Sequence, residues 1–432
     1  MTIRNLDPLL DPSSVAVFGA SDRPSSVGAT VWRNLRAGGF AGRLLAVNPR
    51  LSTLDGVRVH GGVEDLPETP DLAVLCTPPH TVAPLVAELA ARGTRAAVVM
   101  TAGLSAAQKQ AMLDAARPTC FRILGPNCLG LMTPHLGLNA SFAHTDALAG
   151  DIAFVSQSGA LVTAMLDWAK TRRIGFSYLV SLGEHADVDF GDLLDRLGSD
   201  GRTRSILLYI ESIEAARKFM SAARAAARNK PVIVVKAGRA GAGVKAAASH
   251  TGALAGSDIV FDAAIRRAGM LRVDTLGDLF VAAQTLARFA ANGSEAMTIM
   301  TNGGGGGVMA ADFAALSGVP LAELPAGVLA KLDAQLPPTW SRANPVDIIG
   351  DAPVARYTAT LEALLDDRST GAVLFVHAPT AIVPSPEIAQ ACAPIAQRTP
   401  GRVMACWLGD AALREARAIF EAAGIPNYAT PE

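Results

Sequence analysis

The chain has 432 residues, half of them hydrophobic, and its 38 Lys and Arg residues nearly balance 39 Asp and Glu residues. This near-neutral balance argues against a nucleic-acid surface, which normally shows a clustered excess of Lys and Arg. No run of about 20 apolar residues is free of charge, so we predict no membrane span. Because a typical domain has about 100 to 200 residues, the length suggests roughly three domains.

The cysteines and histidines indicate neither a disulfide framework nor a metal site. Five cysteines are scattered without CxxC or similar spacing, which is typical of reduced thiols. The histidines other than His250 lack ligand spacing, and we predict no bound metal. Since the N-terminal residues MTIRNLDPLLDPSS lack the apolar stretch of a signal peptide, we expect a cytoplasmic protein.

Short apolar runs alternate with longer helical patterns along almost the whole chain. The runs predicted to be strands are Val15–Gly19, Leu44–Val47, Leu72–Cys76, Ala96–Met100, Ile152–Val155, Ile206–Ile210, Val232–Val235, Thr298–Thr301, Ala372–Val376 and Val403–Trp407. Buried strands separated by helices are typical of βαβ units and parallel sheets. We therefore predict an α/β fold with three doubly wound domains and mainly parallel sheets.

Two less regular stretches set the expected domain boundaries. The stretch Gly125–Gly150 is rich in Gly, Pro and His and is predicted to be a loop, and Ala291–Glu295 is typical of a turn-rich link. The expected domains are residues 1–130, 150–291 and 296–432. The last residues, GIPNYATPE, follow what should be a final strand, so we expect the chain to be cut at a domain edge.

The first predicted strand leads into a glycine-containing turn and a helix. The residues assigned to this turn are Gly19, Ala20, Ser21, Ser25, Val27 and Gly28. Such a turn lets backbone N–H groups face a phosphate at the helix N-terminus. Because the spacing departs from GxGxxG, it leaves NAD, CoA and a ligand-free structural turn open.

The ends of the next two predicted strands favour CoA over NAD. The acidic ribose-binding residue that NAD sites have about 20 residues further on is not convincing here. Instead the second strand ends in Asn48, Pro49 and Arg50, which offer an amide and a cation to a phosphorylated nucleotide such as CoA. We assign Thr77 and Pro78, which follow the third strand, to the same site.

A second turn, made of Ser156, Gln157, Ser158 and Gly159, lies between a predicted strand and a helical pattern. Two hydroxyl groups and a glycine at a helix N-terminus form a plausible phosphate or oxyanion site. A simple Ser N-cap explains the turn about equally well. The GxSxG motif is absent, which argues against the nucleophile elbow of a hydrolase.

The most unusual stretch places small residues on both sides of one histidine, in the order Ser249, His250, Thr251, Gly252. Small neighbours leave an imidazole accessible, and a histidine nucleophile can carry phosphate as a phosphoramidate. Glu211, at the end of a predicted strand, could accept the second ring N–H and stabilise the phosphorylated ring. The alternatives are a structural or surface histidine and a solvated charge at a strand end.

A run of five glycines, Gly303–Gly307, follows the predicted strand Thr298–Thr301. We predict a turn here, which would be either an anion-binding nest or a flexible connection.

Four segments together resemble the ADP-forming acyl-CoA synthetases, which are related to the α-subunit of succinyl-CoA synthetase. They are SVAVFGASDRPSSVGATV near the N-terminus, GPNCLGLMTP at Gly125–Pro134, FVSQSGAL at Phe154–Leu161, and KAGRAGAGVKAAASHTGALAGSD at Lys236–Asp258. The resemblance covers nearly the whole chain, and the segment around His250 is its most specific part. It implies a Rossmann-like CoA-binding domain followed by two flavodoxin-like domains.

The resemblance also implies a three-step reaction. Acyl-CoA and phosphate give acyl phosphate and CoA, the acyl phosphate phosphorylates a histidine and releases the acid, and the phosphohistidine passes its phosphate to ADP. The implied nucleophile is His250, supported by Glu211. The implied phosphate site contains Ser156, Gln157, Ser158, Gly159, Thr251 and Gly252. The implied CoA site contains the residues of the first turn and of the next two strand ends, with Asn127 near the thioester.

The same resemblance implies partners outside this chain. The step with ADP or ATP and Mg belongs to an ATP-grasp domain, and no part of this sequence resembles one. We therefore expect the chain to need an ATP-grasp domain or β-type subunit, to act on a small carboxylic acid, CoA and phosphate, and to form an oligomer. Relatives often have Gly-Asn where this chain has Gly183-Glu184, which leaves the acyl group open.

Two other functions compete with this interpretation. The first is a non-catalytic acyl-CoA-sensing module of the kind fused to protein acetyltransferases. Such modules commonly lack the histidine, so the presence of His250 and Glu211 argues against this reading. The second is an NAD-dependent dehydrogenase, which the missing ribose-binding carboxylate disfavours.

Overall fold

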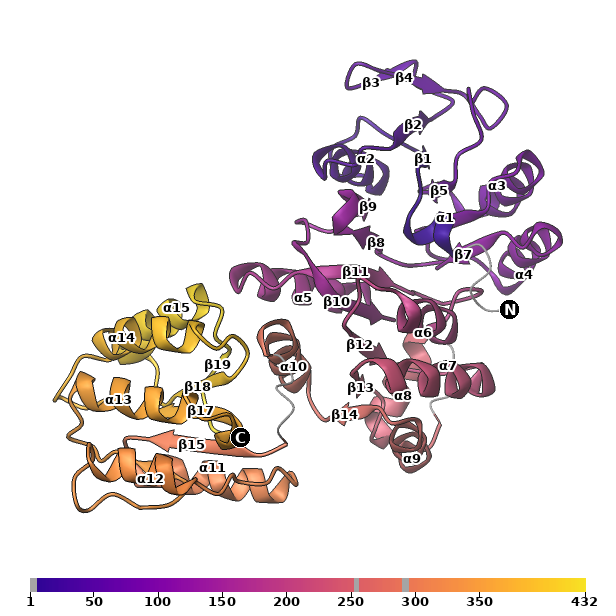
Figure 1. The fold of residues 1–432 in the computed structure, drawn as a ribbon. Coiled ribbons are helices and arrows are strands. Elements are labelled where there is room, and N and C mark those ends of the chain that lie inside the picture. The colour runs from indigo at the N-terminus through magenta and orange to yellow at the C-terminus, as the bar shows by residue number, and fades with distance from the viewer. Residues whose placement is uncertain (1–5, 252–255, 290–294) are drawn as a thin grey trace. The chain divides into compact units, whose positions relative to one another are not determined.

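The computed structural model describes residues 6–251, 256–289 and 295–432, without the side chains of residues 247–251 (Figure 1). Its strands form three sheets that are mostly parallel, so the predicted α/β fold class is confirmed. The chain divides into two compact units, Met1–Ala283 and Gln284–Glu432, and the first unit contains two of the three sheets. None of the described helices combines the length and the apolar content that crossing a membrane requires.

The first sheet has seven strands with the first strand of the chain near its centre. In spatial order they are β3 (Thr53–Leu54), β4 (Val57–His60), β2 (Arg43–Val47), β1 (Ser14–Phe18), β5 (Leu72–Leu75), β6 (Ala96–Val99) and β7 (Arg122–Leu124). The helices of this part are α1 (Asp7–Leu10), α2 (Val27–Ala37), α3 (Pro79–Arg92) and α4 (Ala106–Ala116), with a 3-10 turn at Arg117–Thr119. Among the described strand pairs of this sheet, β3–β4 is antiparallel and the others are parallel.

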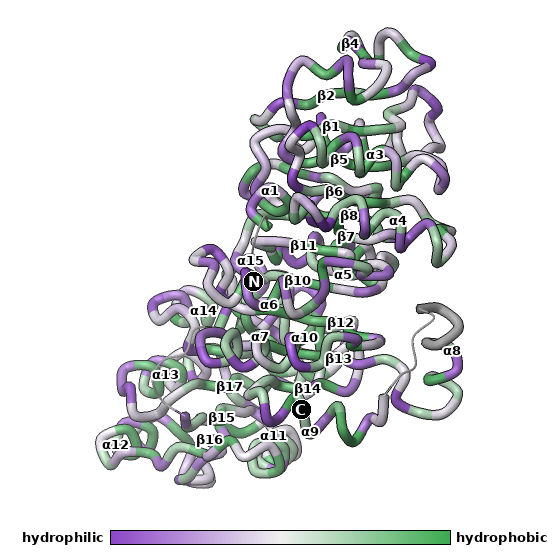
Figure 2. The backbone as a smooth tube through the Cα atoms, turned by 90° about the vertical axis from the view of Figure 1, so that its right-hand side faces the viewer, coloured by the Kyte–Doolittle hydropathy of each residue, from purple (hydrophilic) through white to green (hydrophobic). Residues whose placement is uncertain are grey.

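The strands of this sheet are hydrophobic on both faces because helices cover both faces. All residues of β1, β5 and β6 are buried, and Figure 2 colours β5 and β6 mainly in the green of hydrophobic residues. Val15 and Val17 belong to one buried cluster and Ala16 and Phe18 to another. This alternation follows from the two-residue period of a strand, and a continuous apolar run is what a fully covered parallel sheet requires.

The second sheet also has seven strands. In spatial order they are β14 (Leu271–Val273), β13 (Val232–Lys236), β12 (Ser205–Ile210), β10 (Ala149–Ser156), β11 (Phe176–Ser181), β8 (Gly130–Thr133) and β9 (Leu138–Ser141). Its helices are α5 (Gly159–Thr171), α6 (Phe190–Ser199), α7 (Ala216–Asn229), α8 (Gly241–Thr251), α9 (Asp258–Ala268) and α10 (Leu276–Arg288). A 3-10 turn lies at Pro134–Leu136.

The prediction of a loop throughout Gly125–Gly150 is wrong. β8 and β9 form an antiparallel hairpin in this stretch, and β8 pairs with β11 at the edge of the second sheet. All residues of both strands are buried. Because this burial comes from contacts with distant segments, the Gly and Pro content of the stretch did not reveal it.

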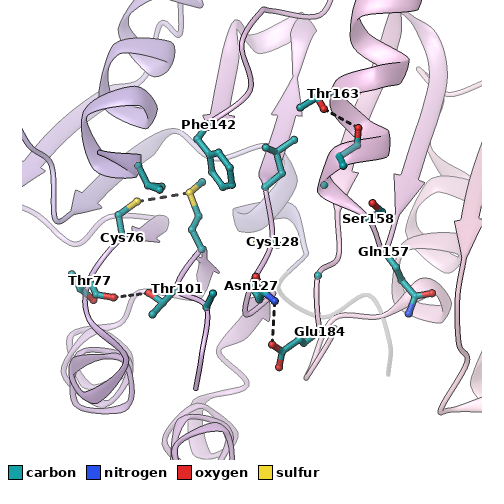
Figure 3. A pocket seen from close by; sticks show the side chains of 17 residues that line it. Cys76, Thr77, Thr101, Asn127, Cys128, Phe142, Gln157, Ser158, Thr163 and Glu184 are labelled. Carbon is teal, nitrogen blue, oxygen red and sulfur yellow. Dashed lines mark hydrogen bonds between the residues drawn. The ribbon is translucent and has the colours of Figure 1, made fainter. Parts of the chain in front are cut away.

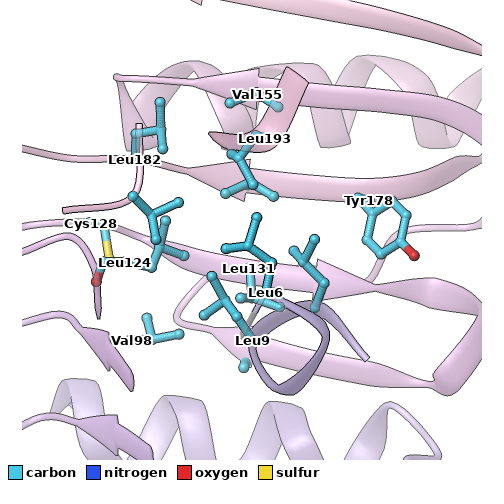
Figure 4. Packing of buried hydrophobic residues seen from close by; sticks show 14 of the residues in the cluster. Leu6, Leu9, Val98, Leu124, Cys128, Leu131, Val155, Tyr178, Leu182 and Leu193 are labelled. Carbon is cyan, nitrogen blue, oxygen red and sulfur yellow. The ribbon is translucent and has the colours of Figure 1, made fainter. Parts of the chain in front are cut away.

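One hydrophobic cluster joins the two sheets of the first unit. It contains Leu6 and Leu9 from the N-terminal region, Val98 from β6, and Leu131 and Val155 from the second sheet, all at most 1% exposed (Figure 4). Arg122 adds ion pairs of 3.0 and 3.1 Å to Asp187 and Asp192. The two sheets therefore pack as one body, which fixes the ends of their strands relative to each other.

The second unit contains a five-stranded parallel sheet. In spatial order its strands are β16 (Val346–Asp347), β15 (Met297–Thr301), β17 (Ala372–His377), β18 (Val403–Trp407) and β19 (Asn427–Tyr428). Its helices are α11 (Gly304–Leu316), α12 (Ala326–Asp333), α13 (Val354–Leu365), α14 (Ser385–Gln397) and α15 (Arg414–Ala422), with 3-10 turns at Arg368–Thr370 and Ala411–Leu413.

The core of the second unit is aromatic on one side of the sheet. Phe375 and Phe420 pack around Trp407, with ring centroids 5.4 and 5.0 Å from it. His377 is fully buried beside them, and its ring nitrogens lie 3.0 Å from the hydroxyl groups of Tyr357 and Ser385. Burial lowers the pKa of His377 to about 4, so this histidine is a neutral core residue at physiological pH.

The five glycines at Gly303–Gly307 do not form a separate turn. Gly303 caps helix α11, and the helix begins at Gly304. A β-carbon on Gly306 would lie 2.9 Å from a methyl carbon of Leu408, and one on Gly307 would lie 2.9 Å from the methyl carbon of Thr301. Glycine is needed at both positions because the first turn of the helix lies close against the sheet.

Candidate functional site

The first predicted turn follows β1, which lies between two parallel neighbours near the centre of the first sheet. β1 pairs with β2 on one side and with β5 on the other, all parallel. The residues that follow these strands therefore meet at one edge of the sheet, which is where α/β proteins bind ligands. The predicted residues gathered there are Gly19, Ala20, Ser21, Ser25, Val27, Gly28, Asn48, Pro49, Arg50, Thr77 and Pro78.

Two glycines allow the turn after β1 to approach the start of α2 closely. Gly19 has φ +85°, and a β-carbon there would lie 2.6 Å from the carbonyl oxygen of Cys76. A β-carbon on Gly28 would lie 1.9 Å from the carbonyl oxygen of Gly19. Ser26 caps α2 by accepting a hydrogen bond from the Ala29 N–H at 3.2 Å. The helix N-terminus is thus held directly beside the turn.

The end of β2 is tied to the same turn. The Asn48 side-chain amide donates a hydrogen bond of 2.7 Å to the Ala20 carbonyl, and the Arg50 N–H donates one of 2.9 Å to Asn48 Oδ1. Pro49 and Arg50 are exposed. Asn48 therefore shapes the backbone, whereas the Arg50 side chain is open to solvent and available to a phosphate.

The second predicted turn lies at the corresponding point of the second sheet. β10 pairs with β11 on one side and with β12 on the other. Ser156 Oγ donates to the Ser158 carbonyl at 2.8 Å and accepts from the Ser158 N–H at 3.0 Å. Ser158 is the N-cap of α5, and its side chain makes no capping hydrogen bond. The first N–H groups of α5 are therefore presented beside a free hydroxyl group, which suits an anion.

Gln157 joins this turn to the end of β12. Its Oε1 accepts hydrogen bonds from the N–H groups of Glu211 and Ser212 at 2.5 and 3.0 Å, and its Nε2 donates to Ser212 Oγ at 3.2 Å. All three residues are buried. The amide of Gln157 thus holds Glu211 beside the turn.

Glu211 has a further partner on its own strand. Burial, the charge of Glu211 and a hydrogen bond with its carboxylate raise the pKa of Tyr209 to about 12. The Tyr209 hydroxyl therefore stays protonated and donates to Glu211. Neither Tyr209 nor Ser212 was predicted from the sequence. The contact of Ser212 with Gln157 depends on how neighbouring strands align.

A cavity of about 660 Å³ connects the two sheet edges of the first unit (Figure 3). The predicted site residues that line it are Val27, Thr77, Asn127, Gln157, Ser158 and Gly159. The other lining residues are Cys76, Met100, Thr101, Ala102, Cys128, Leu129, Phe142, Ala160, Thr163, Gly183 and Glu184, which the sequence did not single out as ligand contacts. The lining offers apolar, sulfur and polar contacts.

Asn127 and Glu184 form one polar wall of the cavity. The Asn127 amide lies 3.4 Å from Oε1 of Glu184, and Oε2 of Glu184 pairs with Lys109 at 2.8 Å. Asn127 has φ +56°, and a β-carbon on Gly183 would lie 2.4 Å from the Pro126 carbonyl oxygen. This close backbone approach brings a residue from the end of each sheet into one wall.

The predicted nucleophile, His250, belongs to helix α8 (Gly241–Thr251). His250 and Thr251 lie in helix α8, but their side chains fall outside the described residues, and so does Gly252. Among the described residues no group of three or more His, Cys, Asp or Glu side chains is placed to hold a metal ion.

The third sheet repeats the local design of the second. Thr301 Oγ1 donates to the Gly303 carbonyl at 2.9 Å and accepts from the Gly303 N–H at 3.1 Å, as Ser156 does with Ser158. Asn302 exchanges hydrogen bonds of 2.8 and 2.9 Å with the backbone of Ala378, which follows β17. Asn302 thus takes the place that Gln157 has in the second sheet.

These features define an α/β protein with a glycine turn of the nucleotide-binding type at one sheet edge and an anion-type helix N-terminus at the other, and Val27 and Ser158 from the two places line one cavity. Comparison with known families gives the same class. A CoA binding domain matches residues 13–134, a succinyl-CoA ligase like flavodoxin domain matches residues 149–286, and a Ligase-CoA domain matches residues 297–431.

Individual relatives narrow the class to one family. The α-subunit of acetate–CoA ligase [ADP-forming] I from Pyrococcus furiosus is 34% identical over 99% of this chain and 95% of its own length. Acetate–CoA ligase [ADP-forming] I from Archaeoglobus fulgidus is 37% identical over 99% of this chain, which spans 62% of that longer relative. The structure of the dinucleotide-forming acetyl-CoA synthetase 1 of Ca. Korarchaeum cryptofilum has a TM-score of 0.94 and 33% identity, with 99% of this chain and 94% of that chain covered. The chain belongs to the family of ADP-forming acetate–CoA ligases.

Proposed function

We propose that this chain is the α-type half of an ADP-forming acyl-CoA synthetase, which interconverts acyl-CoA, phosphate and ADP with a carboxylic acid, CoA and ATP. The observation that supports the proposal is one cavity lined by Val27 and Thr77 of the predicted CoA site and by Gln157, Ser158 and Gly159 at the start of helix α5. A thioester and a phosphate must meet for the first step, and this cavity has a place for each.

In this proposal CoA enters from the first sheet. The turn after β1, with the helix α2 N-terminus and Arg50, binds the phosphates, and the pantetheine arm follows Thr77 and Asn127 towards the second sheet. Phosphate lies at the N-terminus of α5, where Ser158 and the N–H groups of Gly159 and Ala160 favour an anion. A phosphate oxygen then attacks the thioester carbonyl carbon, the C–S bond breaks, and the CoA thiolate takes up a proton.

His250 is assigned as the phosphoryl carrier. An imidazole nitrogen attacks the phosphorus of the acyl phosphate, the bond from phosphorus to the acyl oxygen breaks, and the carboxylate leaves. Glu211, held by Gln157 and Tyr209, supports the ring by accepting its other N–H and stabilising the positive charge. Thr251 and Gly252 complete the proposed phosphate site.

The nucleotide step needs a partner. A β-type subunit or fused domain of the ATP-grasp kind, with Mg, would transfer phosphate between His250 and ADP. Support comes from the relatives: this chain spans 62% of a longer ligase but 95% of a chain named an α-subunit. We also propose an oligomeric, cytoplasmic enzyme built from the three domains predicted above. All five cysteines are free thiols, which fits a reducing compartment.

The sensing-module alternative is not favoured. Relatives that match most of this chain are named acetate–CoA ligase, 4-hydroxybutyrate–CoA ligase and trans-feruloyl-CoA synthase. The proposed acid substrate of this chain is a small or medium monocarboxylic acid.

The test is phosphate labelling of the chain. Acyl-CoA with radioactive phosphate, or labelled acyl phosphate, should give acid-labile label on the protein, and His250→Asn should abolish it while CoA binding measured by calorimetry survives. His144→Asn is the matched control, because this exposed histidine of the same unit pairs with Asp167 at 3.6 Å and does not line the cavity. Equal labelling of wild type and His250→Asn would show that the carrier is misassigned, and CoA binding without any labelling would support the sensor.

A further inference from the structure

Four charged side chains lie at the two ends of the segment that carries His250. Arg239 follows β13 and precedes α8, and Asp258 is the first residue of α9. Arg272 lies in the edge strand β14, and Asp274 follows it. None of the four lines the cavity described above, and all four line a separate surface hollow.

Arg272 fixes the start of α9. Its Nη2 donates to both carboxylate oxygens of Asp258 at 2.8 Å, and its Nη1 lies 3.4 Å from Oδ1 of Asp262. The side chain of Arg272 is 8% exposed, and its guanidinium carbon lies 5.7 Å from the centroid of the Phe261 ring. The charge-assisted hydrogen bonds between the buried Arg272 side chain and Asp258 are therefore stronger than an exposed ion pair, and they fix the orientation of the two groups.

Arg239 joins the other end of the segment to the same group. Its Nη2 lies 2.8 Å from Oδ1 of Asp274, and its Nη1 donates to the Asp274 carbonyl at 3.1 Å. Its Nε lies 3.7 Å from Oδ2 of Asp258. Asp258 therefore contacts an arginine from before the segment and an arginine from β14, so both ends of residues 240–257 are tied to one place.

Lys236 and Phe261 support this arrangement from inside the fold. The ammonium group of Lys236, at the end of β13, donates to the carbonyl groups of Ala237 and Gly238 at 2.9 and 3.2 Å. It also lies 5.4 Å from the Phe261 ring centroid, so the ring contacts cations from two strands. The ends of β13, β14 and α9 are thereby packed together beneath the charged pairs.

We propose that Arg239, Asp258, Arg272 and Asp274 form an electrostatic collar that fixes both ends of the His250 segment, and that Arg272 is a positioning residue for phosphoryl transfer. The proposal rests on the assignment of His250 as the carrier. A displacement of about 1 Å at a reacting group can reduce a rate a hundredfold. A collar that holds both ends of this 18-residue segment sets where the segment leaves and rejoins the fold, without touching the substrate. Arginine suits position 272 because its two terminal nitrogens reach Asp258 and Asp262 at the same time, whereas lysine has one nitrogen.

The test compares Arg272→Met and Arg272→Lys with the matched control Arg266→Met. Arg266 is also paired with Asp262, at 3.0 Å, but it is 78% exposed and has no bond to Asp258. The first measurement is single-turnover labelling of the chain by acyl phosphate, with CoA binding and the thermal unfolding midpoint recorded beside it. The second is hydrogen–deuterium exchange of peptides that cover residues 240–257.

Arg272→Met should slow labelling about tenfold or more and accelerate exchange in residues 240–257, while CoA affinity stays within twofold. Arg272→Lys should give an intermediate loss, and Arg266→Met should match the wild type. Unchanged exchange in Arg272→Met would overturn the collar, and so would a lower unfolding midpoint with a wild-type labelling rate. If Arg272→Met fails to fold, Arg272→Lys and Asp258→Asn decide by the same criteria. Accelerated exchange without labelling of the wild type would support the collar and contradict the assignment of His250.

Discussion

Replacing Gly28 by alanine adds one methyl group at the point where helix α2 meets the turn after β1. The new β-carbon would lie 1.9 Å from the carbonyl oxygen of Gly19, and contacts under 3.0 Å are essentially never found. Helix and turn must therefore separate by about 1 Å. Alanine favours a helix over glycine by about 1 kcal/mol, whereas overpacking of this kind costs about 1–3 kcal/mol. The cost of the clash should exceed the gain in helix propensity, and the turn after β1 should move away from the start of α2.

The assay is calorimetric titration with CoA, together with urea unfolding. Gly28→Ala should weaken CoA binding tenfold or more, which corresponds to about 1.4 kcal/mol, and should not stabilise the protein. Gly277→Ala is the matched control, because Gly277 also lies in a helix and its β-carbon would meet only Thr275 Oγ1 at an ordinary 3.5 Å. That variant should be neutral or slightly more stable. CoA affinity within twofold of wild type in Gly28→Ala would refute the reasoning.

Three further predictions concern buried polar groups. Gln157→Leu removes the acceptor of two buried N–H groups, each worth about 1–3 kcal/mol when left unpaired, so the free energy of unfolding should fall by at least about 2 kcal/mol in urea titrations. Arg122→Met strips Asp192, whose side chain is 2% exposed, of one of its cations, and should cost about 3–5 kcal/mol in the same assay. Burial lowers the pKa of His377 to about 4 from an unfolded value near 6.5, so the second unit should lose up to about 3 kcal/mol as the pH falls from 6.5 to 4.

Each of these has its own check. Gln157→Leu with wild-type stability would mean that Glu211 and Ser212 find other acceptors. Arg117→Met removes an arginine that is 74% exposed beside Asp114 and should change stability by less than about 1 kcal/mol; an equal loss in both arginine variants would show that burial is not the cause. A nuclear magnetic resonance titration of His377 with a midpoint near 6.5 would contradict the pH prediction.

Most of the strands and the positions of the first two turns could be predicted because each depends on local sequence. Fully buried strands such as Val15–Phe18 are continuous apolar runs, and a turn that must approach a helix closely requires glycine, as at Gly19 and Gly28. Glycine and serine after β1 and β10 therefore predicted the two sheet edges at which the turns lie. The resemblance to a known family supplied the assignments of His250 and Glu211, which local patterns left open.

What could not be predicted depends on contacts between distant segments. The hairpin β8–β9 becomes strand only because β11 offers it a sheet edge. The glycines that begin α11 have low helix propensity, and packing against Thr301 and Leu408 decides their conformation. The support of Glu211 by Gln157 requires the register of two neighbouring strands, and the polar wall of Asn127 and Glu184 requires the packing of two sheets.

The repeated design of the second and third sheets has a consequence of its own. Each sheet has a hydroxyl group that closes the turn, a side-chain amide that binds the backbone after the neighbouring strand, and a helix that begins at glycine. The residue that follows that neighbouring strand is Glu211 in the second sheet and Ala378 in the third. The chain thus carries its own natural comparison, with the same scaffold present once with an acid and once without it.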